Sequence, residues 1–256
     1  MIGLVELRDE GSSAPNVRHR RNDRDLHPVY GTDVTRVGSS VRRHYNQPSP
    51  SREGSCTMSK VVAIMSMSLD GYVADANDGV AEVFDWYFSG DVEVSTASTT
   101  SGMTFHVSAP SADHLRGLQA EVGAMLTGRR TFEAADGWGG QHPWDVPAFV
   151  VTHHVPDGWP RPGSTVQFVT DGIESAVARA KSAADPKSVL VHGAQTIQQC
   201  LDAGLLDEIH IDLAAVLLGA GVRLFDHLAN TPVVLGNPTV VTGVGVTHLR
   251  YPVHTS

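Results

Sequence analysis

The chain has 256 residues, of which 41% are hydrophobic and 18% are charged, and its formal net charge is -9. These fractions are ordinary for a globular protein and exclude a wholly disordered, collagen-like or disulfide-stapled chain. No uncharged apolar run approaches the roughly eighteen residues that a membrane-spanning helix needs, and the start lacks the apolar core of a secretory signal. Cys56 and Cys200 form no C-x-x-C pair that could hold zinc. We therefore expect a soluble, cytoplasmic protein with no membrane partner.

The first 57 residues differ in composition from the rest of the chain. They contain nine arginines and no lysine against seven acidic residues, and their aliphatic residues follow no sustained period of 2 or 3.6. We expect residues 1–57 to be a disordered extension, because Met58 stands directly before the first strand-like segment like a natural start. A nucleic-acid-binding arm is disfavoured, since the acidic residues nearly cancel the positive charge. One folded domain, residues 58–256, remains.

Segments typical of strands and helices alternate through this domain. Runs rich in β-branched residues predict buried strands at 60–67, 148–152, 166–170, 188–192 and 208–216. Apolar residues on one helical face predict helices at 112–125, 173–184 and 196–203. Residues 75–110 are expected to form a long loop with a short helix near 84–88.

The last part of the domain contains strand-like segments with no helix between them, at 233–235, 239–241 and 244–251. They predict an antiparallel hairpin, whereas the alternation before them predicts parallel strands with crossover helices. The expected fold class is α/β: a single three-layer domain with a mixed, mostly parallel sheet and a C-terminal antiparallel hairpin.

Several common catalytic motifs are absent from the sequence. It contains no Gly-Lys-Ser/Thr step of a Walker loop, no G-x-S-x-G elbow and no H-E-x-x-H zinc motif. Gly219-Ala220-Gly221 starts a G-x-G pattern, but Leu224 stands in place of the third glycine of a Rossmann fingerprint. The 13 histidines are expected to be scattered and mostly exposed, with no metal site.

Two glycine-containing segments are suited to an anion. Residues 128–131 (GRRT) bring a hydroxyl, two guanidinium groups and backbone N–H groups to the start of a helical segment. Residues 192–196 (HGAQT) lie between a strand and a helix, where small residues let the backbone approach a ligand. The alternatives are a plain helix cap with solvated arginines and an ordinary tight turn. Two such segments in one α/β domain suggest a dinucleotide.

Four motifs, in order along the chain, carry a resemblance to a known family. They are SMSLDGYVA at 66–74, GRRTFE at 128–133, GLLDEI at 204–209 and LLGAGVRLF at 217–225. Together they resemble the dihydrofolate-reductase-like superfamily, and more narrowly the C-terminal reductase domain of the riboflavin-pathway bifunctional deaminase-reductase. The zinc signature of the deaminase half, H-x-E with P-C-x-x-C, is absent from the first 57 residues.

The resemblance implies NADPH as the cofactor. The nicotinamide would lie near the end of the first strand, beside Ser68, Leu69 and Gly71. The phosphates and the adenosine would be held by residues that follow later strands, namely Gly128, Arg129, Arg130, Thr131, Thr152, His153, Gly193, Ala194, Gln195 and Thr196.

The resemblance also implies that Asp70 and Glu208 face the reacting end as catalytic residues. The residues alone leave alternatives open, because Asp70-Gly71 is a good turn signal and Glu208 could be the solvated start of a strand. Trp138 is a candidate for the substrate pocket, since aromatic planes stack on flat heterocycles, or it could be a loop anchor.

Two positions depart from the family pattern. His192 precedes Gly193 where the phosphate turn of the family begins Gly-Gly, and it adds a side chain where the backbone approaches the cofactor. Tyr72 stands where a lysine commonly follows the S-x-D-G motif, which removes a cation that could bind a sugar phosphate.

The implied function is an NADPH-dependent reductase of a pterin-like or aminopyrimidine heterocycle, similar to 5-amino-6-(5-phosphoribosylamino)uracil reductase of riboflavin biosynthesis. Dihydrofolate reduction and a non-catalytic NADPH-binding module are the alternatives. The resemblance also implies that the protein is a homodimer and that it binds a small heterocyclic substrate.

Overall fold

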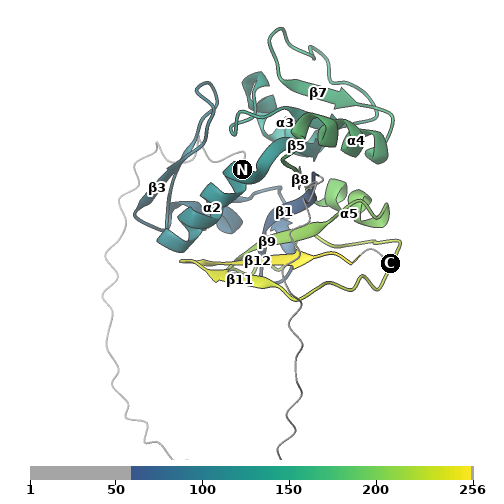
Figure 1. The fold of residues 1–256 in the computed structure, drawn as a ribbon. Coiled ribbons are helices and arrows are strands. Elements are labelled where there is room, and N and C mark those ends of the chain that lie inside the picture. Colours follow the sequence, from purple (N-terminus) through teal and green to yellow (C-terminus); the bar gives the residue numbers. More distant parts are fainter. Residues whose placement is uncertain (1–58, 255–256) are drawn as a thin grey trace, which may run out of the picture. The chain divides into compact units, whose positions relative to one another are not determined.

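An eight-stranded sheet runs through residues 59–254, the part of the chain that the computed structural model describes (Figure 1). In spatial order the strands are β11 (Thr239–Thr242), β12 (Val246–Pro252), β9 (Glu208–Ala214), β1 (Val61–Ser68), β8 (Ser188–His192), β5 (Val122–Gly128), β6 (Ala148–Val151) and β7 (Val166–Val169). All pairs from β9 to β7 are parallel, and β12 pairs antiparallel with β9 and β11. The predicted fold class, a mostly parallel α/β sheet closed by a C-terminal hairpin, is confirmed.

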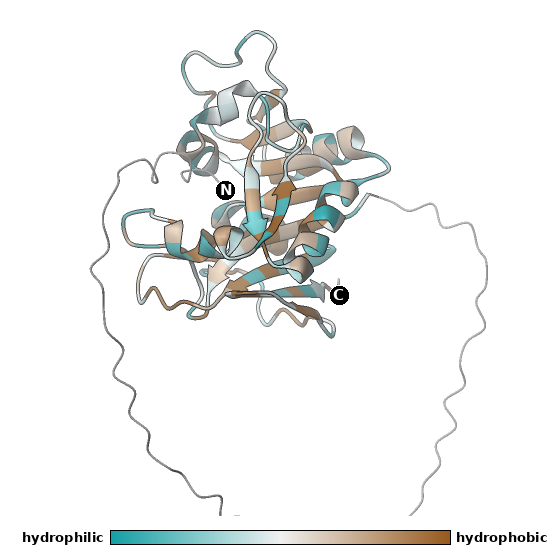
Figure 2. Cartoon of the chain, turned by 90° about the vertical axis from the view of Figure 1, so that its left-hand side faces the viewer, coloured by the Kyte–Doolittle hydropathy of each residue, from teal (hydrophilic) through white to brown (hydrophobic). Residues whose placement is uncertain are grey.

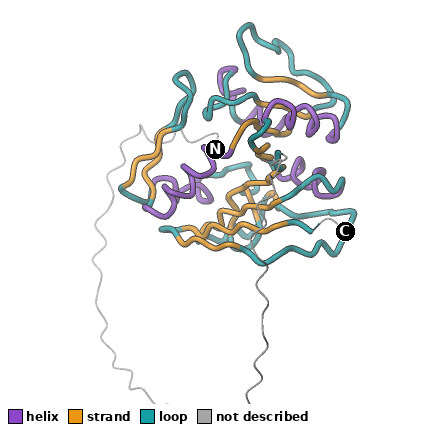
Figure 3. Tube along the Cα trace, viewed as in Figure 1, coloured by secondary structure: helices purple, strands orange, loops and turns teal. Residues whose placement is uncertain are grey.

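Helices cover both faces of this sheet (Figure 3). They are α1 (Ala81–Phe84), α2 (Ala109–Glu121), α3 (Arg129–Ala134), α4 (Ile173–Ala184) and α5 (Ala194–Asp202), with the 3-10 helices η1 (Asp85–Phe88) and η2 (Asp136–Gly140). None of these helices has the length and apolarity needed to cross a lipid bilayer within residues 59–254.

Two hydrophobic cores lie on the two faces of the sheet, because successive strand residues point to opposite sides. On β1, Val62 and Ile64 belong to the core that includes the inner face of α2. Val61 and Ala63 belong to the core that includes α4 and α5. In Figure 2 the strands in the middle of the molecule are coloured as hydrophobic, which agrees with burial on both faces. The two cores hold the strand ends, and the loops that follow them, in fixed positions.

The helix predicted at 112–125 is wrong at its C-terminal end. α2 ends at Glu121, and β5 begins at Val122 without an intervening loop. The helical spacing of Leu118, Val122 and Met125 continues into the strand, which is why periodicity alone extended the helix. Pairing of β5 with β6 and β8 decides the conformation instead.

The long loop predicted at 75–110 contains more regular structure than expected. Besides α1 and η1 it forms a hairpin of β3 (Val92–Ser95) with β4 (Thr104–Val107), in which Val94 opposes Phe105. A second small pair joins β2 (Tyr72–Ala74) to β10 (Val222–Arg223). The strand predicted at 233–235 is only a single bridge, between Leu235 and Val253.

The predictions made for the N-terminal segment, a disordered extension over residues 1–57 with a natural start at Met58, lie outside the described residues.

The buried sheet generates a first prediction. Val191 of β8 is fully buried, and replacing it with alanine removes apolar contacts on a strand that is covered on both faces. We expect the Val191→Ala variant to lose about 1.5–3 kcal/mol of unfolding free energy in urea denaturation. The matched control is Val240→Ala on edge strand β11, where the side chain is 53% exposed and little loss is expected. Equal losses for both variants would contradict this account of the core.

Candidate functional site

The loops predicted to hold a cofactor lie at one edge of the sheet. Strands β1, β8, β5 and β6 are parallel neighbours, so their carboxyl ends share this edge. Ligands bind at this edge in open α/β sheets. The structure therefore brings residues 68–71, 128–131, 152–153 and 193–196 to the same end of the molecule.

The two predicted anion segments are in direct contact through their glycines. A Cβ atom on Gly193 would lie 2.7 Å from Oγ1 of Thr131, and a Cβ atom on Gly128 would lie 2.8 Å from Oγ1 of Thr196. Each glycine thus makes room for the threonine hydroxyl of the other segment. The φ angle of Gly193 is 88°, which also favours glycine. Backbone N–H groups and two hydroxyls at neighbouring helix starts fit the oxygen atoms of a phosphate.

The two arginines of the first segment are exposed and paired with carboxylates. Arg129 Nε donates to Glu133 Oε1 over 2.7 Å within α3. Arg130 forms an ion pair with Asp78, a residue of the turn before α1. Both guanidinium groups lie beside the glycine contact in the chain, and a bound phosphate would compete with these carboxylates for them.

The remaining predicted cofactor residues differ in their surroundings. Thr152, which directly follows β6, is buried, and its hydroxyl donates to the carbonyl of His154 over 2.8 Å. His153 and Gln195 are exposed, whereas Ala194 is buried at the start of α5. The hydroxyl of Thr152 therefore fixes its own turn, and His153 and Gln195 are free of the core.

Asp70 holds the loop that follows β9. Its carboxylate accepts hydrogen bonds from Ser68 Oγ at 2.6 Å, from the Leu218 N–H at 3.1 Å and from the Gly219 N–H at 2.7 Å. The Ser68 hydrogen bond and these backbone donors lower the pKa of Asp70. A carboxylate with three donors gives up its charge reluctantly. This geometry favours a role for Asp70 in positioning the loop over a role as proton donor.

Arg223 is a functional candidate that the sequence reasoning missed. Its Nη2 donates to the Tyr72 hydroxyl over 2.9 Å, and its guanidinium carbon lies 4.5 Å from the centre of the Tyr72 ring. A cation therefore stands beside the position where the family has lysine. The signal was present in the LLGAGVRLF motif, because β10 pairs with β2 and so brings Arg223 next to Tyr72.

Glu208 does not lie in this site, and the expectation that it faces the reacting end is corrected. It is the first residue of β9 and pairs with Val62 near the start of β1, whereas Asp70 follows the end of β1. Because the two strands are parallel, Glu208 lies at the opposite edge of the sheet. There it accepts hydrogen bonds from Lys60 at 2.6 Å and His210 at 2.8 Å, and its pKa is lowered to about 2, mainly by the His210 hydrogen bond.

Trp138 is held in an uncommon backbone conformation. Five consecutive residues, from Asp136 to Gly140, have positive φ angles, and the value for Trp138 is 50°. Non-glycine residues avoid this region, and such strain concentrates at functional sites. The Trp138 side chain is only 9% exposed and lies edge-on to the rings of Phe132 and His142.

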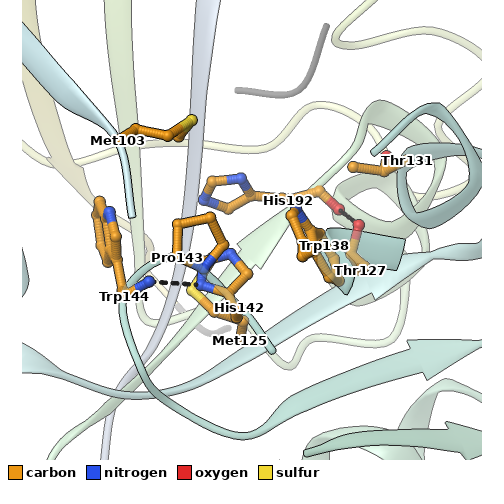
Figure 4. Close-up of a pocket in the computed structure, with 9 residues that line it drawn as sticks. All are labelled: Met103, Met125, Thr127, Thr131, Trp138, His142, Pro143, Trp144 and His192. Carbon is orange, nitrogen blue, oxygen red and sulfur yellow. Dashed lines mark hydrogen bonds between the residues drawn. The ribbon is translucent and has the colours of Figure 1, made fainter. Parts of the chain in front are cut away.

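Trp138 lines a pocket together with two histidines (Figure 4). His142 accepts a hydrogen bond from the Trp144 N–H, and the His192 carbonyl accepts one from the Thr127 hydroxyl over 3.2 Å. Burial lowers the pKa of His192 to about 3 and holds the pKa of His142 well below its usual range. Both rings are therefore neutral near pH 7. His192 directs its side chain into this pocket, while Gly193 makes the backbone contact with Thr131.

A second pocket shares Thr131, Trp144 and His192 with the first and reaches Asp212 on β9. Asp212 is buried with His114 and His248. One ligand atom from each of the three lies within 4.8 Å of the others, so their atom types could hold a metal ion. The two imidazole rings stack at 4.0 Å with 20° between their planes, and an oxygen of Asp212 already accepts a hydrogen bond from His248. Nearly parallel rings direct their nitrogens alongside one another, which suits a hydrogen-bond network better than a metal.

The expectation that the histidines are mostly exposed is wrong for several of them. His114, His142, His210 and His248 are all buried. Composition alone gave no indication of this, because tertiary packing decides which residues of α2, β9, β12 and the segment after η2 are buried.

Comparisons with known proteins identify the family of the chain and support its fold. The family model of the RibD C-terminal domain matches residues 59–252. A protein assigned to riboflavin biosynthesis from Shewanella sp. PV-4 is similar in structure, with a TM-score of 0.57 and 22% identity over 77% of this chain and 99% of that one. None of the curated proteins compared with the chain matches it.

Two further solved structures share the fold. Acinetobacter baumannii RibD has a TM-score of 0.51 and 17% identity over 77% of this chain and 58% of that one. Dihydrofolate reductase from Enterococcus faecalis, solved with NADP(H), has a TM-score of 0.50 and 11% identity over 77% of this chain and 98% of that one.

The buried histidines predict a loss of stability in mild acid. The unfolded chain binds protons on His142 and His192 below about pH 6.5, but the folded protein does not, because burial lowers both pKa values. The unfolding free energy should therefore fall as the pH drops from 7 to 5, by up to about 2 kcal/mol for each histidine. Urea denaturation at the two pH values measures the change, and a His142→Gln variant should show a smaller one. An unfolding free energy that is equal at both pH values would refute the neutral assignment.

Proposed function

The chain belongs to the RibD C-terminal domain family, and we propose that it is an NADPH-dependent reductase of a pterin-like or aminopyrimidine heterocycle. The observation that carries this proposal is the pair of glycine–threonine contacts at the carboxyl edge of the sheet. They form a cradle for phosphate beside a pocket that contains a strained tryptophan. The proposed substrate class resembles that of 5-amino-6-(5-phosphoribosylamino)uracil reductase of riboflavin biosynthesis.

The cofactor end of the proposed site is built from backbone and small side chains. Gly128 and Gly193 leave space where a Cβ atom would meet a threonine hydroxyl, so the residues fit a pyrophosphate group. Arg129 and Arg130 would exchange their carboxylate partners for phosphate oxygens. NADPH, when bound, supplies the hydride, and the protein orients it and excludes water.

The substrate end combines flat apolar surface with a small number of polar groups. Trp138 offers a plane for a heterocycle, and the neutral His192 offers a ring nitrogen that has no hydrogen-bond partner among the described residues. Arg223 beside Tyr72 supplies a cation for an anionic part of the substrate. NADPH binding without turnover of any heterocycle would favour the alternative of a non-catalytic module.

The proposed phosphate contact predicts a preference for NADPH over NADH. In the proposed site Arg129 contacts the 2′-phosphate, which NADPH has and NADH lacks. Replacing Arg129 with alanine removes this charge-assisted donor, so the NADPH dissociation constant should rise roughly tenfold to hundredfold while NADH binding changes little. Isothermal titration calorimetry with both cofactors measures this difference. The matched control is Arg116→Ala on α2, an exposed arginine outside the site. Equal affinity of the wild type for both cofactors would sink the idea.

The hydrogen bonds of Asp70 predict a positioning effect. In the wild type the Asp70 carboxylate accepts hydrogen bonds from the backbone N–H groups of Leu218 and Gly219. In an Asp70→Asn variant the amide nitrogen, itself a donor, would face one of these N–H groups, so the loop at 218–219 should shift. We expect hydride transfer to fall about 10²-fold, by a similar factor at every pH, while NADPH affinity is retained. Single-turnover absorbance at several pH values gives the result, with the exposed Asp91→Asn as control. A change in the shape of the pH profile would instead support Asp70 as a proton donor.

A further inference from the structure

A buried carboxylate stands at the wall of the second pocket. Asp212 is 2% exposed, and on β9 it lies between Ser66 of β1 and His248 of β12 in the sheet register. The same pocket is lined by Tyr87 and His192, so it reaches the histidine of the predicted cofactor loop. A buried charge is costly unless hydrogen bonds compensate it, so the partners of Asp212 require an explanation.

A chain of hydrogen bonds leads away from Asp212. His248 Nδ1 donates to Asp212 Oδ1 over 2.7 Å. With the proton on Nδ1, the neutral ring has an acceptor at Nε2, and Ser111 Oγ lies 2.9 Å from it. Ser108 Oγ donates to Ser111 Oγ over 3.0 Å. Every donor in this chain therefore points towards the pocket.

The outer end of this chain of hydrogen bonds, at Ser108, lies close to the surface. Ser108 is half-buried and precedes α2, and the N–H of Val244, a residue that is 55% exposed, donates to its hydroxyl. Ser108 occupies the helix-capping position, yet its hydroxyl makes no capping hydrogen bond. A Cβ atom on Gly243 would lie 2.2 Å from Ser111 Oγ, so glycine at this turn leaves room for the hydroxyl pair.

The other polar groups around Asp212 keep it ionised in the resting protein. His114 Nε2 of α2 lies 3.1 Å from the same oxygen, although its direction does not meet hydrogen-bond geometry. Tyr87 of η1 and His192 face the same carboxylate, and Arg250 of β12 acts on His114. Burial raises the pKa of Asp212, but the contacts with His114 and His248 outweigh it and lower that pKa.

We propose that Ser108, Ser111, His248 and Asp212 conduct a proton from solvent to the pocket during the reduction. This inference rests on the proposed function, because reduction of a double bond adds a hydride to one atom and a proton to the other. Ser108 passes a proton to Ser111, Ser111 passes one to His248 Nε2, and His248 Nδ1 passes one to Asp212. In each step the donor loses one bond to hydrogen and the acceptor gains one.

The last step completes the balance of the reaction. Asp212 passes its proton to the substrate atom that holds the electron pair left by hydride addition, and solvent returns a proton to Ser108. No electron moves along the chain. Rotation of the two hydroxyls and exchange of the His248 ring proton between its nitrogens restore the starting arrangement.

Nuclear magnetic resonance of the full ¹⁵N-labelled chain tests the path without any substrate. We expect His248 to carry its proton on Nδ1, and exchange of this proton with water to slow about tenfold or more in Ser111→Ala. Ser108→Ala, which removes a half-buried hydroxyl, should act in the same direction. Ser59→Ala, a buried serine before β1 at the opposite edge, should leave the exchange unchanged. A His248 proton on Nε2, or unchanged exchange in Ser111→Ala, would overturn the proposal.

Kinetics tests the role of the path in turnover. The rate of single-turnover hydride transfer from NADPH is measured in mixtures of light and heavy water. This rate should vary nonlinearly with the deuterium fraction, because several protons move. In Ser111→Ala the rate should fall about tenfold or more, and its dependence on the deuterium fraction should become linear. Wild-type behaviour of Ser111→Ala, or equal slowing in Ser59→Ala, would overturn the role. If none of the heterocycles tested supports NADPH oxidation by the wild type, the proposed function fails. The resonance experiment still decides whether the path exists.

Discussion

The common direction of the parallel strands is the constraint on which the rest of the structure depends. Because β1, β8, β5 and β6 run the same way, the four loops that follow them meet at one edge, where residues 128–131 contact residues 193–196. The opposite edge is then left for structural contacts. The ion pair of Lys60 with Glu208 belongs there and ties the start of β1 to the start of β9. Chemistry and anchorage are thus separated by strand polarity.

The sequence predicted most of the sheet and failed where local pattern and pairing disagree. Residues 188–192 and 173–184 form the predicted strand and helix, because β-branched runs and one-sided apolar faces identify buried elements. β5 was hidden because Val122 and Met125 continue the helical period of α2. The hairpin of β3 and β4 was hidden because its strands are short. Strand pairing, which the periodicity of one segment does not describe, distinguishes these elements.

The candidate site was predictable where backbone chemistry carries the signal and not where packing does. Glycine and threonine at 128–131 and 193–196 indicated an anion site, and the structure brings the two segments together. Asp212 and His248 gave no such signal, since isolated polar residues within apolar strands reveal neither their burial nor their partners. Their hydrogen bond depends on the register of β9 with β12, which sequence spacing does not define. Glu208 was misplaced for another reason: its role was carried over from the resemblance, although the start of a strand parallel to β1 lies at the opposite edge from Asp70.

The reciprocal packing of Gly128 with Thr196 and of Gly193 with Thr131 has a consequence for how this site can change. Neither glycine can be enlarged without a shift, because a new methyl group on it would lie only 2.7 or 2.8 Å from a threonine hydroxyl oxygen of the other segment. A tolerated substitution would have to be accompanied by trimming of the opposing threonine. Gly128 should therefore covary with Thr196, and Gly193 with Thr131, among related chains. This covariation is expected although about sixty-five residues separate the members of each pair along the chain.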